Sequence, residues 1–265
     1  MQDSLVSLLS AAPLVPTAFP QSADALCTFA RALHAEGYPA LELLARPQES
    51  MLEVWRQIID RPERRLILWG AGTIKTATAA REVVELRPNF LVSPAFSRRV
   101  LEVAVANNIP YIPGVHSFQD VQDVIDAFDE HGLEVNVLKL CPVYGLTSEY
   151  VASLCGCFPG IQFCPTGEID WDNYQFWKRQ PGIIAPMGSR MFPREFIAAS
   201  DEPVIRARLK KLRGLAKPLL PQIPTSNRGD NTPFASDPGT RIELDGISVT
   251  ASYPVREPPT RRATI

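Results

Sequence analysis

No run of apolar residues in this 265-residue chain reaches the roughly 18 residues that a membrane-spanning helix needs. An excess of charge of either sign is also missing, because 27 Lys and Arg stand against 29 Asp and Glu and leave a net charge of −2. Such a balance provides no polybasic surface for nucleic-acid phosphates or anionic lipids. We therefore expect neither a membrane nor a nucleic acid among the partners of this protein.

A basic segment is missing from the first residues, MQDSLVSLLSAAPLVP, which also contain Asp3. Secretory signal peptides begin with a positively charged segment. This stretch does not resemble one, and the expected compartment is the cytoplasm.

Histidine and cysteine are both rare, at three and five residues. An odd number of cysteines without an export signal argues against a disulfide framework. The cluster of Cys155, Cys157 and Cys164 matches no common zinc-finger spacing, and we interpret these residues as buried structural thiols. Of the three histidines, we expect only His116 near an active site. One histidine without an acidic cluster makes a poor metal site. We expect no metal and no other cofactor.

Proline is the one residue in marked excess, at 25 of 265 residues. Eight of these prolines fall within the last 49 residues, which is about three times the usual share. We therefore divide the chain into a folded domain at 1–216, with a short N-terminal helix, and a proline-rich extension at 217–265. Within the extension, two β-like runs around Asp245 and Gly246 predict a β-hairpin near 242–253.

Upstream of that boundary, short apolar runs alternate with helical patterns. Eight such runs begin about every 24 residues and predict parallel strands at 14–17, 40–44, 65–69, 90–93, 110–114, 134–140, 161–165 and 182–186. An open doubly wound sheet is the alternative, but eight even steps favour a closed barrel. The predicted fold class is therefore α/β, a (β/α)8 TIM barrel with a proline-rich C-terminal extension.

Three of the intervening helices have clear sequence signatures. Ser22 can cap a helix that ends at Gly37, and Ser117 can cap a second helix that ends at Gly132. In the third helix, at 204–217, six cations surround one apolar stripe, which predicts a solvated outer face. The stripe consists of Ile205, Leu209, Leu212 and Ala216.

The active site of such a barrel lies at the C-terminal ends of its strands, and Lys139 is the most informative residue there. It stands in the apolar run VNVLKLCPV, where strand alternation places it opposite Leu138 and Leu140 and allows it to point into the barrel. Charging an amine there costs free energy, which makes the neutral nucleophile accessible for a Schiff base with a ketone. A lysine that is paired with a carboxylate, or that reaches the barrel rim, is the alternative.

Glu42 is a second charge in an apolar run, ALELLAR. A carboxylate there can act as a general acid or base where its surroundings favour the protonated form. The structural alternative is a buried ion pair with Arg46 or Lys139.

Gly70 and Gly72 follow the third predicted strand and begin a motif that resembles a dinucleotide-binding turn. The motif needs a third glycine at the position that Lys75 occupies. We therefore expect no nucleotide at this turn.

Together, these strand ends resemble the family of KDPG (2-keto-3-deoxy-6-phosphogluconate) and KHG (4-hydroxy-2-oxoglutarate) aldolases. The segments that carry the resemblance, in order and spacing between about 12 and 212, are LELLAR, GAGT, SP at 93–94, IPYIPG, LKLCP and FCPTG. The resemblance implies a class I pyruvate aldolase, which uses no metal, on a (β/α)8 barrel that usually forms a homotrimer. Its implied partner is a small keto acid substrate.

The resemblance also implies roles for individual residues. Lys139 matches the Schiff-base lysine and Glu42 the general acid/base, while Arg46 and Thr73 match residues that hold the pyruvate carboxylate. The remaining substrate-binding positions that it implies are Pro94, Thr166, Gly167, Gly188 and Ser189.

Several positions depart from the family pattern. Glu168 stands where the family usually has the second glycine of Thr-Gly-Gly, and Met187 stands where it usually has the first glycine of Gly-Gly-Ser. Those two loops form the family's phosphate site from backbone N–H groups. A carboxylate at position 168 repels a phosphate dianion unless a cation such as Arg190 offsets it. In addition, Cys141 replaces a frequent aromatic residue, and the tail has no family counterpart.

We therefore expect a Schiff-base aldolase that cleaves KDPG and/or 4-hydroxy-2-oxoglutarate to pyruvate and an aldehyde. A non-phosphorylated 2-keto-3-deoxy acid is the alternative substrate. Two alternative functions would need no imine: a barrel isomerase or decarboxylase, and a non-catalytic barrel whose tail recruits a partner.

Overall fold

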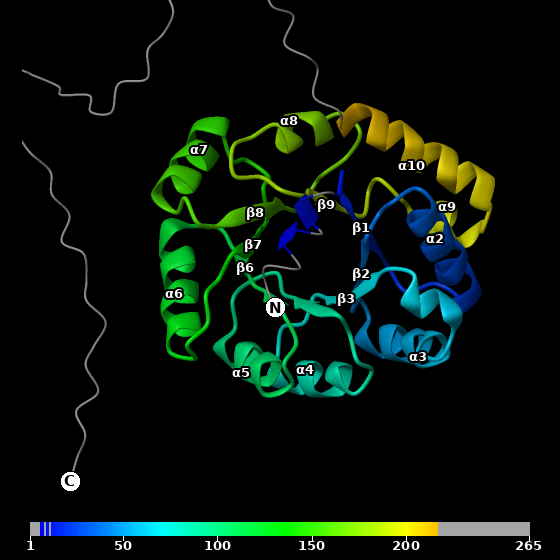
Figure 1. Ribbon diagram of the computed structural model, residues 1–265, viewed down its shortest axis with the longest axis horizontal. Coiled ribbons are helices and arrows are strands. Elements are labelled where there is room, and N and C mark those ends of the chain that lie inside the picture. The colour runs from blue at the N-terminus through cyan, green and yellow to red at the C-terminus, as the bar shows by residue number, and fades with distance from the viewer. Residues whose placement is uncertain (1–5, 8, 11, 217–265) are drawn as a thin grey trace, which may run out of the picture. The chain divides into compact units, whose positions relative to one another are not determined.

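The computed structural model describes residues 6, 7, 9, 10 and 12–216 (Figure 1). Residues 6, 7, 9 and 10 are helical. The expected extension at 217–265, with its hairpin near 242–253, lies outside the described residues.

Short parallel strands at the centre are surrounded by helices (Figure 1). The strands are β1 (Val15–Ala18), β2 (Ala40–Leu44), β3 (Leu68–Gly72), β4 (Phe90–Val92), β5 (Tyr111–Ile112), β6 (Gly114–Val115), β7 (Val137–Leu140), β8 (Gln162–Pro165) and β9 (Met187–Gly188). The helices are α2 (Ala23–Ala35), α3 (Gln48–Ile58), α4 (Ala77–Val84), α5 (Arg98–Ala106), α6 (Phe118–Asp129), α7 (Ser148–Cys157), α8 (Tyr174–Lys178), α9 (Arg194–Ala198) and α10 (Glu202–Ala216), with a 3-10 turn at Pro62–Arg65.

The helix ends agree with their sequence signatures. Ser22 caps α2, and Ser117 caps α6 in a reciprocal capping box with Asp120. Gly37 and Gly132, which follow these helices, have φ values of +70° and +66°, a conformation that glycine adopts without strain. On α10, the predicted stripe residues Ile205, Leu209 and Leu212 are fully buried.

The strand ladders form two parallel sheets within the described residues. One has the order β5-β4-β3-β2-β1-β9 and the other β6-β7-β8. The ladder stops at Pro113, between β5 and β6, because proline has no N–H to donate. Isolated bridges, Phe163 to Ile183 and Thr166 to Met187, connect β8 with the segment that contains β9. The predicted α/β class with parallel strands is confirmed, whereas one continuous ring of ladders is not formed.

Two predicted strands are displaced along the chain. The third predicted strand, 65–69, is found at Leu68–Gly72, so that Gly70 and Gly72 lie within the strand and do not follow it. The eighth, 182–186, contributes only the bridge at Ile183, and β9 begins after Pro186. In both places an apolar run is longer than the strand, and apolar character does not specify which of its residues pair.

A small inner core, to which the strands contribute most of the residues, is separate from the large core between strands and helices. Its buried members are Leu9, Val15, Ala40, Phe90, Val92, Ile112, Val137, Cys164, Ile184, Ala185 and Met187. Strand side chains alternate between faces, so the residue two positions after an inner-core residue shares its face. This periodicity places Lys139, two residues after Val137, and Glu42, two residues after Ala40, directly beyond the inner core.

No helix in the described part of the chain is long and apolar enough to cross a membrane. All five cysteines lie within the described residues and are free. Cys164 is buried, and burial raises its pKa to about 12. The interpretation of the cluster as buried thiols holds for Cys164 alone, because Cys155 is half-buried and Cys157 is exposed at the end of α7.

Candidate active site

A cavity of about 290 Å³ opens at the C-terminal ends of the strands. It is the place where parallel α/β folds of this type position their chemistry. Of the nine predicted site residues, eight line it: Glu42, Arg46, Pro94, Lys139, Thr166, Gly167, Gly188 and Ser189. The ninth, Thr73, contacts the cavity residue Arg46.

A buried ion pair forms the floor of the cavity. Lys139 Nζ on β7 lies 3.1 Å from Glu42 Oε1 on β2, and their side chains are 5% and 0% exposed. Each charge is costly to bury alone, and each compensates the other. The structure thus combines the predicted positions with the alternative interpretation: both side chains point inward, and they pair with each other.

The second oxygen of Glu42 has a different environment. Glu42 Oε2 is buried and has no hydrogen-bond partner among the described residues. A buried carboxylate oxygen without a donor is unfavourable unless water or a ligand supplies one. One oxygen therefore holds the amine, while the other lacks a donor among the described residues.

Gly72 on β3 makes room for this carboxylate. A Cβ atom at Gly72 would lie 2.1 Å from Glu42 Oε1, which is much closer than any van der Waals contact. Glu42 is fully buried and cannot move aside without disturbing the ion pair. The sequence analysis considered Gly72 as part of a nucleotide motif and of the GAGT segment, and missed this role.

Arg46 and Thr73 form a polar pair beside the ion pair. Arg46 Nε donates a hydrogen bond to Thr73 Oγ1 over 3.2 Å. Thr73 has a φ of +65°, a conformation that is unfavourable for a β-branched residue and is often retained where function requires it. Because the guanidinium has several donors, its remaining N–H groups and the hydroxyl suit a planar carboxylate.

The loops after β8 and β9 form the other wall of the cavity. Gly167 has a φ of +99°, and Glu168, with a φ of +60°, is also left-handed. The Glu168 carboxylate forms an ion pair with Arg190, and both side chains are about half exposed. Arg190, the cation that the sequence analysis named as a possible partner of this carboxylate, is thus in contact with it.

Two further side chains line the cavity next to the ion pair. Cys141 follows β7, and burial raises the pKa of its thiol, so that it stays protonated at neutral pH. Thr17 on β1 pairs in register with Glu42 and is only 3% exposed. The sequence analysis missed Thr17 because a threonine in a strand is unremarkable, although it is the only hydroxyl in the run LVPTAF.

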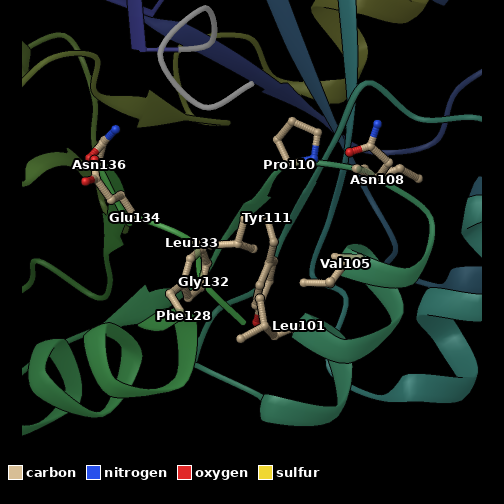
Figure 2. A pocket seen from close by; sticks show the side chains of 12 residues that line it. Leu101, Val105, Asn108, Pro110, Tyr111, Phe128, Gly132, Leu133, Glu134 and Asn136 are labelled. Atoms are coloured by element: carbon tan, nitrogen blue, oxygen red, sulfur yellow. The ribbon is translucent and has the colours of Figure 1, made fainter. Parts of the chain in front are cut away.

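A second cavity, of about 320 Å³, has a different character (Figure 2). It lies between α5 and α6, beside the segments that lead into β5 and β7. Its walls are mainly apolar, with Leu101, Tyr111 and Leu133 among them. Because these segments precede the strands, the cavity is at the opposite end of the strands from the Lys139–Glu42 pair.

The fold and the first cavity together are typical of an enzyme that forms an imine with its substrate. A lysine amine that is buried against a carboxylate, at the C-terminal ends of parallel strands, can form an imine with a bound ketone. A nearby guanidinium supplies a site for an acid group of that ketone. Within the described part of the chain, no three His, Cys, Asp or Glu side chains are grouped to hold a metal ion.

Residues 5–207 match the family of KDPG and KHG aldolases, and the chain belongs to this family. It is 27% identical over 201 residues to the KHG/KDPG aldolase of Escherichia coli, an alignment that covers 76% of this chain and 90% of the relative. It is 29% identical over 195 residues to the 2-dehydro-3-deoxy-phosphogluconate aldolase of Pseudoalteromonas atlantica, with 73% and 86% covered.

A crystal structure shows a similar fold with a reaction intermediate. It is that of KDPG aldolase from Legionella pneumophila, with pyruvate captured as a covalent carbinolamine intermediate. The two chains are 27% identical, and their superposition has a TM-score of 0.68 and covers 78% of this chain and 97% of the other.

Proposed function

We propose that this protein is a Schiff-base aldolase that cleaves a 2-keto-3-deoxy sugar acid or 4-hydroxy-2-oxoglutarate to pyruvate and an aldehyde. The observation that carries the proposal is the buried contact of 3.1 Å between Lys139 Nζ and Glu42 Oε1 at the floor of the cavity. An isomerase or decarboxylase that forms no imine would not need a lysine at this place.

In the first half of the reaction, Lys139 forms a covalent bond to the substrate. A proton leaves the Lys139 ammonium for Glu42, and the neutral amine attacks the ketone carbon to give a carbinolamine. Glu42 then returns a proton, directly or through a water, to the carbinolamine hydroxyl, which departs as water. The product is a protonated imine.

In the second half, the imine accepts the electrons of the bond that breaks. Glu42 removes the proton of the C4 hydroxyl, the C3–C4 bond breaks, and its electron pair moves toward the imine nitrogen. An aldehyde leaves, and an enamine of pyruvate stays on Lys139. Protonation of the enamine at C3 and addition of water release pyruvate and regenerate the amine.

Arg46 and Thr73 are proposed to hold the carboxylate next to the ketone. Their contact of 3.2 Å places a guanidinium and a hydroxyl together, and both can donate to carboxylate oxygens. Holding the acid in this way would fix the ketone carbon over Lys139, which contributes to catalysis through orientation.

We further propose that the two sheets close into one (β/α)8 barrel and that the protein is a cytoplasmic homotrimer. The bridges from β8 to the segment around β9 support closure. The trimer and the compartment rest on the family resemblance and on the sequence.

The test is release of pyruvate by the full chain from KDPG, from 2-keto-3-deoxygluconate and from 4-hydroxy-2-oxoglutarate, with and without a strong chelator. We expect pyruvate from at least one substrate and equal rates with the chelator, because the proposed steps use only Lys139 and Glu42. Absence of pyruvate from all three substrates would refute the proposal. A rate that is lost in chelator and restored by a divalent metal would refute the imine mechanism.

A further inference from the structure

The cavity contains two charged pairs on different strands. Lys139 and Glu42 pair at the floor, while Glu168 and Arg190 pair where the loops after β8 and β9 meet. In the sheet, β9 is separated from β2 by β1. Arg46, two residues beyond β2, therefore comes from a strand that is not adjacent to β9.

Counting charges shows what a substrate can add to this cavity. Its charged lining residues are Glu42, Arg46, Lys139, Glu168 and Arg190. Two cation–carboxylate pairs use four of them, so that among the described lining residues Arg46 alone lacks a carboxylate partner. One unpaired cation matches one substrate carboxylate. No further lining cation is available for a second anionic group.

The backbone conformation at Glu168 indicates a functional role for its side chain. Its φ of +60° is one that glycine adopts more easily than a residue with a side chain. The conformation is fixed from outside, because Asn173 Nδ2 donates a hydrogen bond of 2.6 Å to the carbonyl oxygen of Glu168. A strained residue held in place beside a cavity points to a functional side chain.

We propose that the Glu168–Arg190 pair recognises the end of the substrate remote from the keto acid and selects a hydroxyl over a phosphate. This inference rests on the proposed aldolase function and specifies its substrate class, a non-phosphorylated 2-keto-3-deoxy sugar acid. A terminal hydroxyl can donate to the Glu168 carboxylate and accept from the Arg190 guanidinium without breaking their contact.

A terminal phosphate meets the opposite situation. To bind Arg190, it must displace Glu168, and the displaced carboxylate stays close enough to repel the dianion. Both side chains are about half exposed, so that water and salt weaken the repulsion. The selection should therefore be moderate in size and sensitive to ionic strength.

The experiment compares kcat/KM for cleavage of 2-keto-3-deoxygluconate and of its 6-phosphate, which differ only at the group in question. The wild-type protein should prefer the non-phosphorylated acid. In Glu168→Gln, the ratio of phosphorylated to non-phosphorylated kcat/KM should rise about two- to fivefold, and the rise should shrink in added KCl. In Arg190→Gln, which leaves the carboxylate unpaired, the same ratio should fall.

Glu130→Gln is the matched control, because Glu130 forms a similarly exposed ion pair with Arg98 away from the cavity. Its ratio should equal that of the wild type. A wild-type preference for the phosphorylated acid, or an unchanged or lower ratio in Glu168→Gln, would overturn the inference and leave the aldolase proposal intact. If neither acid is cleaved and borohydride traps no pyruvate on the wild-type protein, both are overturned.

Discussion

At the scale of single residues, the site combines side chains that the sequence makes conspicuous with backbone conformations that it conceals. Lys139 and Glu42 can be predicted because a charge within an apolar strand is rare and costly. The left-handed conformation of Thr73, with a φ of +65°, cannot be predicted, because it opposes the local preference of threonine. Such conformations depend on the surrounding fold, here on β3 and on the contact with Arg46.

Thr73→Gly should separate binding from stability. It removes a hydroxyl that we propose binds the substrate carboxylate, so KM should rise about tenfold, the equivalent of one charged hydrogen bond of roughly 1.4 kcal/mol. It also relieves backbone strain, so Tm should stay the same or rise. Arg87→Gly is the matched control, since Arg87 is exposed with a φ of +52°: its Tm should respond similarly while KM stays unchanged. An unaltered KM in Thr73→Gly would show that the hydroxyl does not bind substrate.

At the scale of elements, the alternation of strands and helices could be predicted, and the exact pairing of strands could not. The helix ends follow from Ser22 and Ser117, since capping is a local interaction. Pairing is not local: β3 pairs with β2 in the register that sets Gly70 opposite Glu42. The third predicted strand ended before Gly70, and so the space that Gly72 leaves for Glu42 was not foreseen.

Gly72→Ala should reduce catalysis without unfolding the protein. The new methyl group would lie 2.1 Å from Glu42 Oε1 and push the carboxylate off Lys139. General acid–base catalysis contributes about 10² to 10⁴ to rates, and we expect kcat to fall about 100-fold while the far-ultraviolet circular dichroism spectrum is retained. Gly156→Ala is the control, because a Cβ at Gly156 in α7 meets no atom within 4 Å. A kcat of Gly72→Ala within twofold of wild type would mean that the position of Glu42 is unimportant.

At the scale of the whole molecule, the fold places one buried and one half-buried lysine, Lys139 and Lys178, in different chemical settings. Lys139 points into the cavity against a carboxylate. Lys178 on α8 donates hydrogen bonds to the carbonyl oxygens of Ala12 and Ile184, and burial lowers its pKa. A lowered pKa makes the neutral, nucleophilic form of Lys178 more accessible. Only the placement of Lys139 at the C-terminal ends of the strands, beside Glu42 and Arg46, argues for Lys139 as the reactive amine.

The most direct test of the account is therefore to locate the imine. The full chain is incubated with pyruvate and sodium borohydride, which reduces an imine to a stable secondary amine, and the modified peptide is identified by mass spectrometry. We predict one adduct, on Lys139. In Lys139→Arg the adduct should be absent and only a trace of aldolase activity should remain, since a guanidinium cannot form the imine. An adduct on Lys178 or Lys75, or one that persists in Lys139→Arg, would contradict the account.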